Sequence, residues 1–283
     1  MTGRSGAAAL ALAAAAALAA CGRGETRAGS GAATAAGTAA APAAPAAPAP
    51  SAPSAPSAPA AVIPAEAKEL VTAIVDDWDA TRATLRRFRR AGASWQPDGA
   101  PWPGVVGKSG AAWGVGLHGA GAPSGRDGPV KREGDGRSPA GAFALRKSYG
   151  YATAPLAGAR LPYVPLDERW QCVDDPASQH YDQILDRTTV TPDWKSAEEM
   201  RRKDELYAWV VDIAHNPARA PGAGSCIFLH VWRSASGGTA GCTAMERTKL
   251  EQLLATLDPS AVFVLLPRAE YAALAPAWAL PPP

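Results

Sequence analysis

The chain has 283 residues, of which 47% are hydrophobic, so it is long enough for one sizeable domain with its own hydrophobic core. Its 28 Lys and Arg residues against 26 Asp and Glu residues give a formal net charge of +2. The densest basic group, RRFRR at 86–90, is typical of a solvated helix face, so nucleic acid is not an expected partner.

The first twenty residues have the features of an export signal. Arg4 supplies positive charge, and AAALALAAAAALAA at 7–20 is an apolar stretch too short and too alanine-rich to hold a transmembrane helix well. Its end, LAAC at 18–21, resembles the bacterial lipobox, in which the cysteine is lipidated and becomes the mature N-terminus. The resemblance predicts a lipoprotein signal peptide over residues 1–20 and lipidation of Cys21, with an ordinary signal peptide as the alternative.

Lipidation of Cys21 implies an exported lipoprotein that is anchored in a membrane and faces the periplasm or cell wall. Gly22, rather than Asp, follows the cysteine, which favours the outer membrane in a bacterium with two membranes. Proline recurs at every third place in much of residues 32–61, an Ala/Pro/Ser tract that cannot build a core. We therefore expect a disordered tether over residues 21–64, reaching up to about 3 Å per residue, and a folded domain over residues 65–283.

The first predicted elements of the domain are a strand, a helix and a set of short strands. ELVTAIVDD at 69–77 is apolar and β-branched, which predicts a strand. DATRATLRRFRRAG at 79–92 spaces Leu85 and Phe88 three apart and ends on a glycine, which predicts a helix. GVVGKSGAAWGVGL at 104–117 contains glycine at short intervals, which is typical of short strands and tight turns.

The rest of the domain is predicted to be rich in strands. Ser196 stands three residues before Glu199, a capping-box pattern typical of a helix N-terminus, and ERTKLEQLLATL at 246–257 repeats leucine at helical spacing. Strands are predicted at residues 141–151, 207–215, 225–232 and 261–267. Many short strands and few helices predict a mainly β domain of the α+β class, not a doubly wound parallel sheet.

Three cysteines lie in the predicted exported domain, where disulfides can form. Because the number is odd, at least one thiol is left free. A Cys172–Cys226 bridge is one possibility, since the sequence does not give the separation of the two Cα atoms. The sequence has no CxxC pair and no His/Cys cluster with metal-ligand spacing, so we expect no zinc site.

His230 and Cys242 are the residues whose surroundings point to chemistry. The apolar run CIFLHVW places His230 inside a strand, where a core histidine is the ordinary interpretation, and Cys242 is equally well explained as a small buried hydrophobe. Gly237, Gly238 and Gly241 give the chain around Cys242 a permissive backbone, and a turn into the following helix would direct N–H groups at the sulfur. Such a setting lowers the pKa of a thiol and prepares an oxyanion pocket, and a nearby histidine completes a Cys–His pair.

The segment LHVWRSASGGTAGCTAM resembles the catalytic core of the L,D-transpeptidase (YkuD-type) family, whose signature is a strand histidine followed by (S/T)-H-G-C. His230 matches the strand histidine, and TAGC at 239–242 matches the rest. Ala240 stands where the better-known members carry a second histidine, and the interval from His230 is shorter than usual. A branch of the family carries T-A-G-C after FLHVW, and this chain is similar to that branch.

Two further segments extend the resemblance to roughly residues 70–267. GPVKREGDGRSPAGAFAL at 128–145 resembles the family's K-x-E-G-D-G element, which frames the substrate groove. SAEEMRRKDELYAWVVDIAHN at 196–216 matches the same branch. The resemblance implies a β-rich, sandwich-like catalytic domain with a few helices.

The family's chemistry implies that the Cys242 thiolate attacks a peptidoglycan stem tetrapeptide, at the bond between the diamino acid at position three and the terminal D-alanine. His230 acts as base and then as acid, and the backbone carbonyl of Val231 orients its imidazole. The amides of Gly241 and Cys242 are the implied oxyanion donors, and Thr239 is expected to hydrogen-bond within the turn. The amine of a second stem then resolves the thioester and gives a 3→3 cross-link.

The segment at 128–145 also supplies candidate substrate-binding residues. Glu133, Asp135 and Arg137 either bind the charged stem peptide or form hydrogen bonds within a turn. His215, at the end of a predicted strand, is expected to be a capping or groove residue and not a catalyst. The resemblance implies no cofactor or metal, and it implies carbapenem-type β-lactams as inhibitors.

Other functions remain open on the sequence alone. An L,D-carboxypeptidase would resolve the same thioester with water, and other peptidoglycan hydrolases would attack a different bond. A non-catalytic peptidoglycan-binding lipoprotein is the alternative from another class, although such a module has no need of both His230 and Cys242. The expected partners are peptidoglycan stem peptides and, through the lipid, a membrane.

Overall fold

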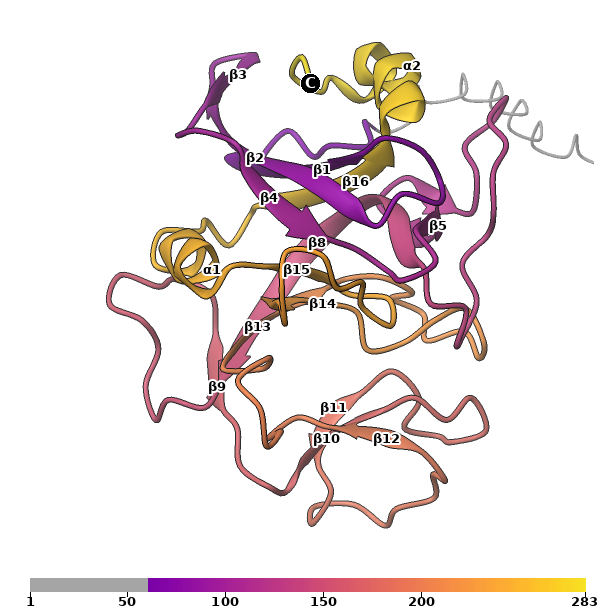
Figure 1. The fold of residues 1–283 in the computed structure, drawn as a ribbon, viewed down its shortest axis with the longest axis vertical. Coiled ribbons are helices and arrows are strands. Elements are labelled where there is room, and N and C mark those ends of the chain that lie inside the picture. The colour runs from indigo at the N-terminus through magenta and orange to yellow at the C-terminus, as the bar shows by residue number, and fades with distance from the viewer. Residues whose placement is uncertain (1–60) are drawn as a thin grey trace, which may run out of the picture. The chain divides into compact units, whose positions relative to one another are not determined.

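The computed structural model describes residues 61–283, so the predicted signal peptide, Cys21 and most of the predicted tether lie outside the described residues. Residues 61–283 form sixteen strands and two helices, which confirms the prediction of a mainly β domain (Figure 1). Neither of these two helices is long and apolar enough to cross a membrane.

Eight strands of the largest sheet close into a ring, because β1 pairs with β16 on one side and with β2 on the other. The order round the ring is β1, β16, β8, β13, β14, β15, β4 and β2, and β3, β5 and β9 pair with members of the ring. These strands are β1 Glu69–Val75, β2 Arg82–Ala91, β3 Ser94–Pro97, β4 Trp102–Val105, β5 Ala111–Trp113, β8 Ser138–Gly150, β9 Tyr163–Pro165, β13 Trp209–Ile213, β14 Phe228–Val231, β15 Thr243–Met245 and β16 Val262–Pro267. The ring is thus one continuously hydrogen-bonded sheet.

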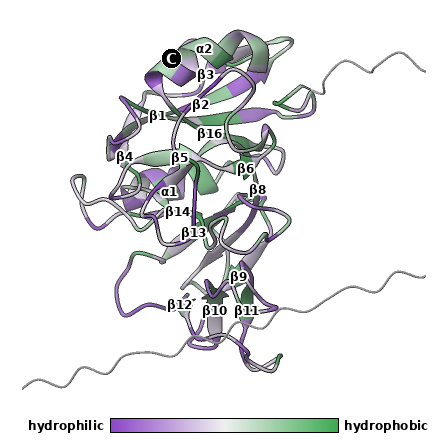
Figure 2. Ribbon diagram, turned by 90° about the vertical axis from the view of Figure 1, so that its right-hand side faces the viewer, coloured by the Kyte–Doolittle hydropathy of each residue, from purple (hydrophilic) through white to green (hydrophobic). Residues whose placement is uncertain are grey.

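The longest strand, β8, contributes to two parts of the ring. Its first half pairs with β16, where Phe143 lies opposite Phe263, and its second half pairs with β13 and β9. Hydrophobic residues gather on the ring strands in Figure 2, and those of β1, of β16 and of β8 up to Leu145 belong to the larger core cluster. The strands predicted at residues 69–77, 141–151, 207–215, 225–232 and 261–267 are confirmed as β1, β8, β13, β14 and β16.

The short strands predicted over residues 104–117 are also confirmed. They are the end of β4, β5, and β6 Val115–Gly116, which pairs with β7 Gly119–Ala120.

Two helices pack against the ring. The predicted helix at residues 246–257 is confirmed as α1 Arg247–Leu254, whose buried leucines face β13 and β14. The second helix, α2 Arg268–Trp278, lies against β1 and β16 and buries Tyr271 and Leu274. It was not predicted from the sequence, because it follows β16 without a connecting loop and contains Pro276, which reads as a helix breaker.

The helix predicted over residues 79–92 is wrong, because Arg82–Ala91 forms the strand β2. Leu85 and Phe88 were spaced like neighbours on a helix face, but in a strand this spacing places them on opposite faces. Both side chains are nevertheless buried, although Arg82 and Thr84, on the same face as Phe88, are exposed. Pairing with β1, β3 and β4 therefore outweighs the helix propensity of a segment rich in Arg and Ala.

The helix N-terminus predicted at Ser196 is also wrong. Residues Ala197–Glu199 form β12, which belongs to a separate small sheet with β10 Trp170–Val173 and β11 Ile184–Asp186. The supposed capping residue, Glu199, lies opposite Gln171 and accepts a hydrogen bond of 2.8 Å from its Nε2. A cross-strand pair thus takes the place of the helix cap.

The small sheet packs against the ring through a second apolar cluster. Met200 and Cys172 come from the small sheet and its flank, whereas Val210 and Phe228 come from β13 and β14. A disulfide joins Cys172 of β10 to Cys226 just before β14. The sequence alone did not decide whether this bridge forms, and the structure contains it. The free thiol of Cys242 lies in this same apolar layer.

Candidate active site

The register of β14 and β15 brings Cys242 close to His230. The two strands are parallel, and His230 lies opposite Ala244. The residue that precedes β15, Cys242, falls beside Phe228, whose N–H donates a hydrogen bond of 3.3 Å to the Cys242 Sγ. Because alternate residues of a strand share a face, Phe228 and His230 point to the same side. Cys242 and His230 are therefore diagonal neighbours on one face of adjacent strands.

A cavity of about 190 Å³ is lined by both Cys242 and His230. Tyr207, just before β13, also lines it, with its ring edge-on to the imidazole at 5.2 Å between centroids. His230 and Tyr207 line a second cavity of about 370 Å³ as well. The histidine thus stands where the two cavities adjoin, and the cysteine faces the smaller one.

His230 is held in one tautomer by the backbone. Its Nδ1 lies 2.7 Å from the carbonyl oxygen of Val231, as the resemblance implied, and this bond requires a proton on Nδ1. The Nε2 atom is then an acceptor that can take a proton. Burial lowers the pKa of His230 to about 4, so the imidazole is neutral near pH 7.

The Cys242 thiol is buried and protonated in the unliganded site. Its Sγ–H donates to the Cys226 carbonyl oxygen at 3.4 Å. Burial raises the pKa of Cys242 far above its usual range, and the negative charge of Glu198 acts in the same direction. The predicted lowering of the thiol pKa is therefore wrong: α1 begins at Arg247, after β15, so its N–H groups are not those that bond the sulfur.

Thr239 closes the turn that carries the cysteine. Its hydroxyl donates to the Cys242 carbonyl oxygen at 2.6 Å and accepts the Gly241 N–H at 3.1 Å. The turn hydrogen bonding expected of Thr239 is confirmed. The Gly241 N–H, an implied oxyanion donor, is occupied by this bond and would have to leave it to serve a substrate. Ser138, which the sequence did not single out, donates to the same Cys242 carbonyl at 2.8 Å.

The glycines around Cys242 act through close packing. None of Gly237, Gly238 and Gly241 has a positive φ, so their backbone conformations are open to other residues. A Cβ atom at Gly238 would lie 2.6 Å from the Cα atom of Lys108, so this glycine is required by the close approach of two chain segments.

Glu133 is the predicted substrate-binding residue that lines the cavity of Cys242. Asp135 does not line it, and instead organises the turn by accepting from Lys131 Nζ at 2.6 Å and from the Arg137 N–H at 2.8 Å. Arg137 is used in the same way, since its guanidinium donates to the Trp78 carbonyl at 2.9 Å.

His215 also lies outside the cavity lining. Its Nδ1 accepts from the Val115 N–H at 3.2 Å, and its Nε2 lies 2.9 Å from the Ala223 carbonyl oxygen. The ring is buried, and burial lowers the pKa of His215 to about 4. Both ring nitrogens are used to connect backbone segments, which is a structural role.

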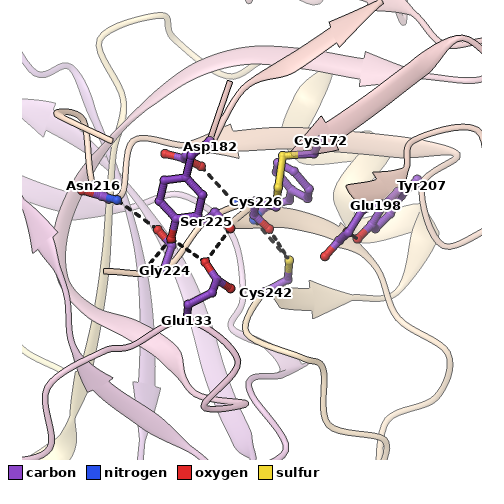
Figure 3. Close-up of a disulfide and its surroundings, with 12 residues drawn as sticks. Glu133, Cys172, Asp182, Glu198, Tyr207, Asn216, Gly224, Ser225, Cys226 and Cys242 are labelled. Atoms are coloured by element: carbon purple, nitrogen blue, oxygen red, sulfur yellow. Dashed lines mark hydrogen bonds between the residues drawn. A yellow bond between two sulfur atoms is a disulfide. The ribbon is translucent and has the colours of Figure 1, made fainter. Parts of the chain in front are cut away.

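Two acidic residues of the cavity were missed by the sequence analysis. Glu198 on β12 and Asp174 just after β10 come from the small sheet (Figure 3 labels Glu198). Glu198 was placed in a predicted helix, and Asp174 is part of an acidic pair in a loop, so no local pattern marked either one. Their contact with the site depends on how the small sheet packs.

Among residues 61–283, no group of three or more His, Cys, Asp or Glu side chains is placed to hold a metal ion. Comparisons of the chain with family models, with curated proteins and with solved structures found no match. The functional conclusion therefore rests on the residues and geometry of the site.

Proposed function

We propose that this chain is a peptidoglycan L,D-transpeptidase, a cysteine-dependent acyltransferase of cell-wall biogenesis. The placement of Cys242 and His230 on one face of adjacent strands, with a common cavity, is the observation that carries the proposal. The resemblance of the segments around them to the L,D-transpeptidase family supplies the substrate class. The proposal includes the family's sandwich-like fold. In this chain, the closed ring of eight strands would correspond to that fold.

In the acylation step, His230 Nε2 accepts the thiol proton as the Cys242 sulfur attacks the carbonyl carbon of the diamino acid at position three. The imidazolium then gives this proton to the nitrogen of the departing D-alanine, and a thioester remains on Cys242. Burial disfavours both the thiolate and the imidazolium. The pair therefore stays neutral until a carbonyl is in place, and proton transfer accompanies the attack.

In the transfer step, the side-chain amine of a second stem attacks the thioester carbonyl. His230 takes a proton from the attacking nitrogen and returns it to the departing Cys242 sulfur. The products are an amide that links two stems, a 3→3 cross-link, and the original thiol. Water in the place of the amine would give the carboxypeptidase reaction.

The proposal includes export and lipid anchoring at Cys21, which the lipobox-like segment supports. An anchor in the membrane would place the domain within reach of the cell wall. Cys21 lies outside the described residues.

The proposal is tested by incubating the full chain with disaccharide tetrapeptides and identifying the products by mass spectrometry. We expect cross-linked dimers, with one D-alanine released for each, and neither product from the Cys242→Ala chain. The Ser236→Ala variant, altered at an exposed position of the same loop, should keep the wild-type product pattern.

The other outcomes separate the alternatives. Release of D-alanine without dimers would identify a carboxypeptidase on the same site. An unchanged substrate, together with no covalent carbapenem adduct on Cys242, would overturn both catalytic functions and leave the peptidoglycan-binding lipoprotein.

A further inference from the structure

Three carboxylates from distant parts of the sequence line the cavity that holds the Cys242 thiol. Glu133 comes from the loop that precedes β8, Asp174 follows β10, and Glu198 lies on β12. In Figure 3, Glu133 and Glu198 appear on opposite sides of Cys242. The wall beside the nucleophile is therefore acidic, and two of its three acids are carried by the small sheet.

The negative charge of this wall is only partly offset by neighbouring cations, since the charge of Arg202 acts on Glu198 without a salt bridge. Within residues 61–283, none of the three carboxylates forms a salt bridge. Lys131 also lines the cavity, but its Nζ is held by Asp135 at 2.6 Å. Arg202 is likewise paired with Asp204 at 2.9 Å.

The hydrogen bonds to the wall come from neutral groups. Glu133 accepts from the Ser225 hydroxyl at 2.7 Å and from the Tyr181 hydroxyl, and Glu198 accepts from the Tyr207 hydroxyl. These bonds orient the carboxylates without neutralising them. Burial, with a further contribution from the charge of Asp174, raises the pKa of Glu198 against the opposing effects of the Tyr207 hydrogen bond and the Arg202 charge.

Asp174 presents an acceptor atom that none of the described residues uses. Its Oδ1 atom is buried and has no hydrogen-bond partner among residues 61–283. An unsatisfied buried carboxylate oxygen is costly, and a donor supplied by a ligand in the cavity would remove that cost. Because Glu133 and Glu198 lie on opposite sides of Cys242, a ligand with several N–H donors suits the acceptors of this cavity.

We propose that Glu133, Asp174 and Glu198 form a recognition site for a primary ammonium group beside the Cys242 thiol. An ammonium presents three N–H donors and one positive charge, which matches separated acceptors around an acidic cavity. The inference rests on the proposed function, because stem peptides carry such a group on the diamino acid. That group belongs either to the stem that is cleaved or to the stem that accepts the acyl group.

The experiment compares tetrapeptides whose side-chain amine is free or N-acetylated, since acetylation removes the charge and leaves the scissile bond intact. In the donor arm, the rate of Cys242 acylation by each tetrapeptide is followed by intact mass. In the acceptor arm, acyl-enzyme is first formed from the acetylated donor. The fractions of this acyl-enzyme that react with a free-amine stem and with water are then measured. Wild-type chain and the Glu198→Gln and Asp174→Asn variants are compared in both arms.

We expect each variant to lower the ratio of kcat/KM for the free-amine substrate to kcat/KM for the acetylated substrate about tenfold or more, as for loss of a charge-assisted hydrogen bond. The ratio removes the effect of the Glu198 charge on the Cys242 thiol, because that effect is common to both substrates. The arm that shows the loss identifies which stem supplies the ammonium. The control is Glu199→Gln on the same strand, because Glu199 pairs with Gln171 and does not line the cavity.

Equal losses with both substrates would mean that the carboxylates only support the fold, and no loss would mean that they do not bind the amine; either result overturns the proposal. Binding of both tetrapeptides to the Cys242→Ala chain, measured by calorimetry, tests recognition without chemistry. A wild-type chain that forms no thioester would refute the proposed function. In that case calorimetry would still test the ammonium site, because tighter binding of the free-amine tetrapeptide supports it and equal binding of the two tetrapeptides overturns it.

Discussion

At the residue scale, the site holds a neutral thiol beside a neutral imidazole. A preformed ion pair would require Cys242 and His230 to be charged at low exposure, and burial opposes both charges. The Val231 carbonyl fixes the proton on Nδ1, which leaves Nε2 ready to accept a proton. Reactivity is therefore expected to depend on a bound carbonyl more than on a standing thiolate.

The low pKa of His230 predicts an unusual pH profile. A general base must be neutral, and burial lowers the pKa of His230 to about 4, so kcat/KM for acylation should stay nearly constant from pH 7 to pH 5. It should fall only as the pH approaches about 4. Acylation rates followed by intact mass across this range provide the measurement. A loss of activity centred near pH 6.5 would contradict a buried, neutral imidazole.

Asp182 predicts a pH effect on stability. Its Oδ1 accepts the Cys226 N–H at 3.0 Å, and burial raises the pKa of Asp182 to about 7, above the value of about 4 in an unfolded chain. Between these values the folded state binds more protons, so the contribution of Asp182 to stability is lost as the pH rises from about 4 to 7. The free energy of unfolding of wild type minus that of Asp182→Asn should therefore decrease across this range.

Urea denaturation at several pH values provides the measurement, and the variant is a suitable reference because Asn keeps the Oδ1 acceptor. A constant difference between the two proteins would show that Asp182 titrates normally.

The residues of the site differ in how far the sequence could predict them. Cys242, His230 and Thr239 lie within seventeen consecutive residues and could be selected from a local motif. Glu198 and Asp174 reach the same cavity only because the small sheet packs against β13 and β14. That contact depends on long-range packing, which leaves no local periodicity in the sequence.

At the element scale, β2 and β12 show where local patterns fail. Both segments carried helix signals, and both became strands because neighbouring strands supply backbone hydrogen bonds that the helix would have supplied internally. By contrast, α1 was predicted correctly, since its leucines repeat at helical spacing and only one face is buried. The ring closure itself was not predictable, because it depends on pairing between β1 and β16.

The disulfide between Cys172 and Cys226 ties the small sheet to the strand that carries His230. It joins residues 54 positions apart, and the Cys226 carbonyl contacts the Cys242 thiol. We expect the Cys172→Ser/Cys226→Ser double variant to lose about 2–4 kcal/mol of unfolding free energy. Acylation should also slow, because the Cys226 carbonyl would no longer hold the Cys242 thiol in place.

Guanidinium denaturation and carbapenem adduct formation measure the two effects. The Cys242→Ser variant, which keeps the bridge, serves as the stability control. A double variant with wild-type stability and acylation rate would show that packing alone holds the small sheet in place.

At the scale of the whole molecule, the lipobox-like segment predicts where the domain works. Each acyl methylene buried in a bilayer contributes about 0.8 kcal/mol, so a lipidated Cys21 would hold the chain in the membrane fraction. We expect Cys21→Ser to abolish fatty-acid labelling and to move the protein into the aqueous phase of a detergent partition. Labelling that persists in the variant would refute lipidation at this position.

The pairing of β1 with β16 also determines when folding can finish. Residues 69–75 find their parallel partner only in residues 262–267, so the ring stays open until nearly the whole domain has been synthesised. A chain that stops before Val262 leaves β1 and β8 each with an unpaired edge, and such edges promote association between chains. Completion of the last strand thus separates finished molecules from truncated, aggregation-prone ones.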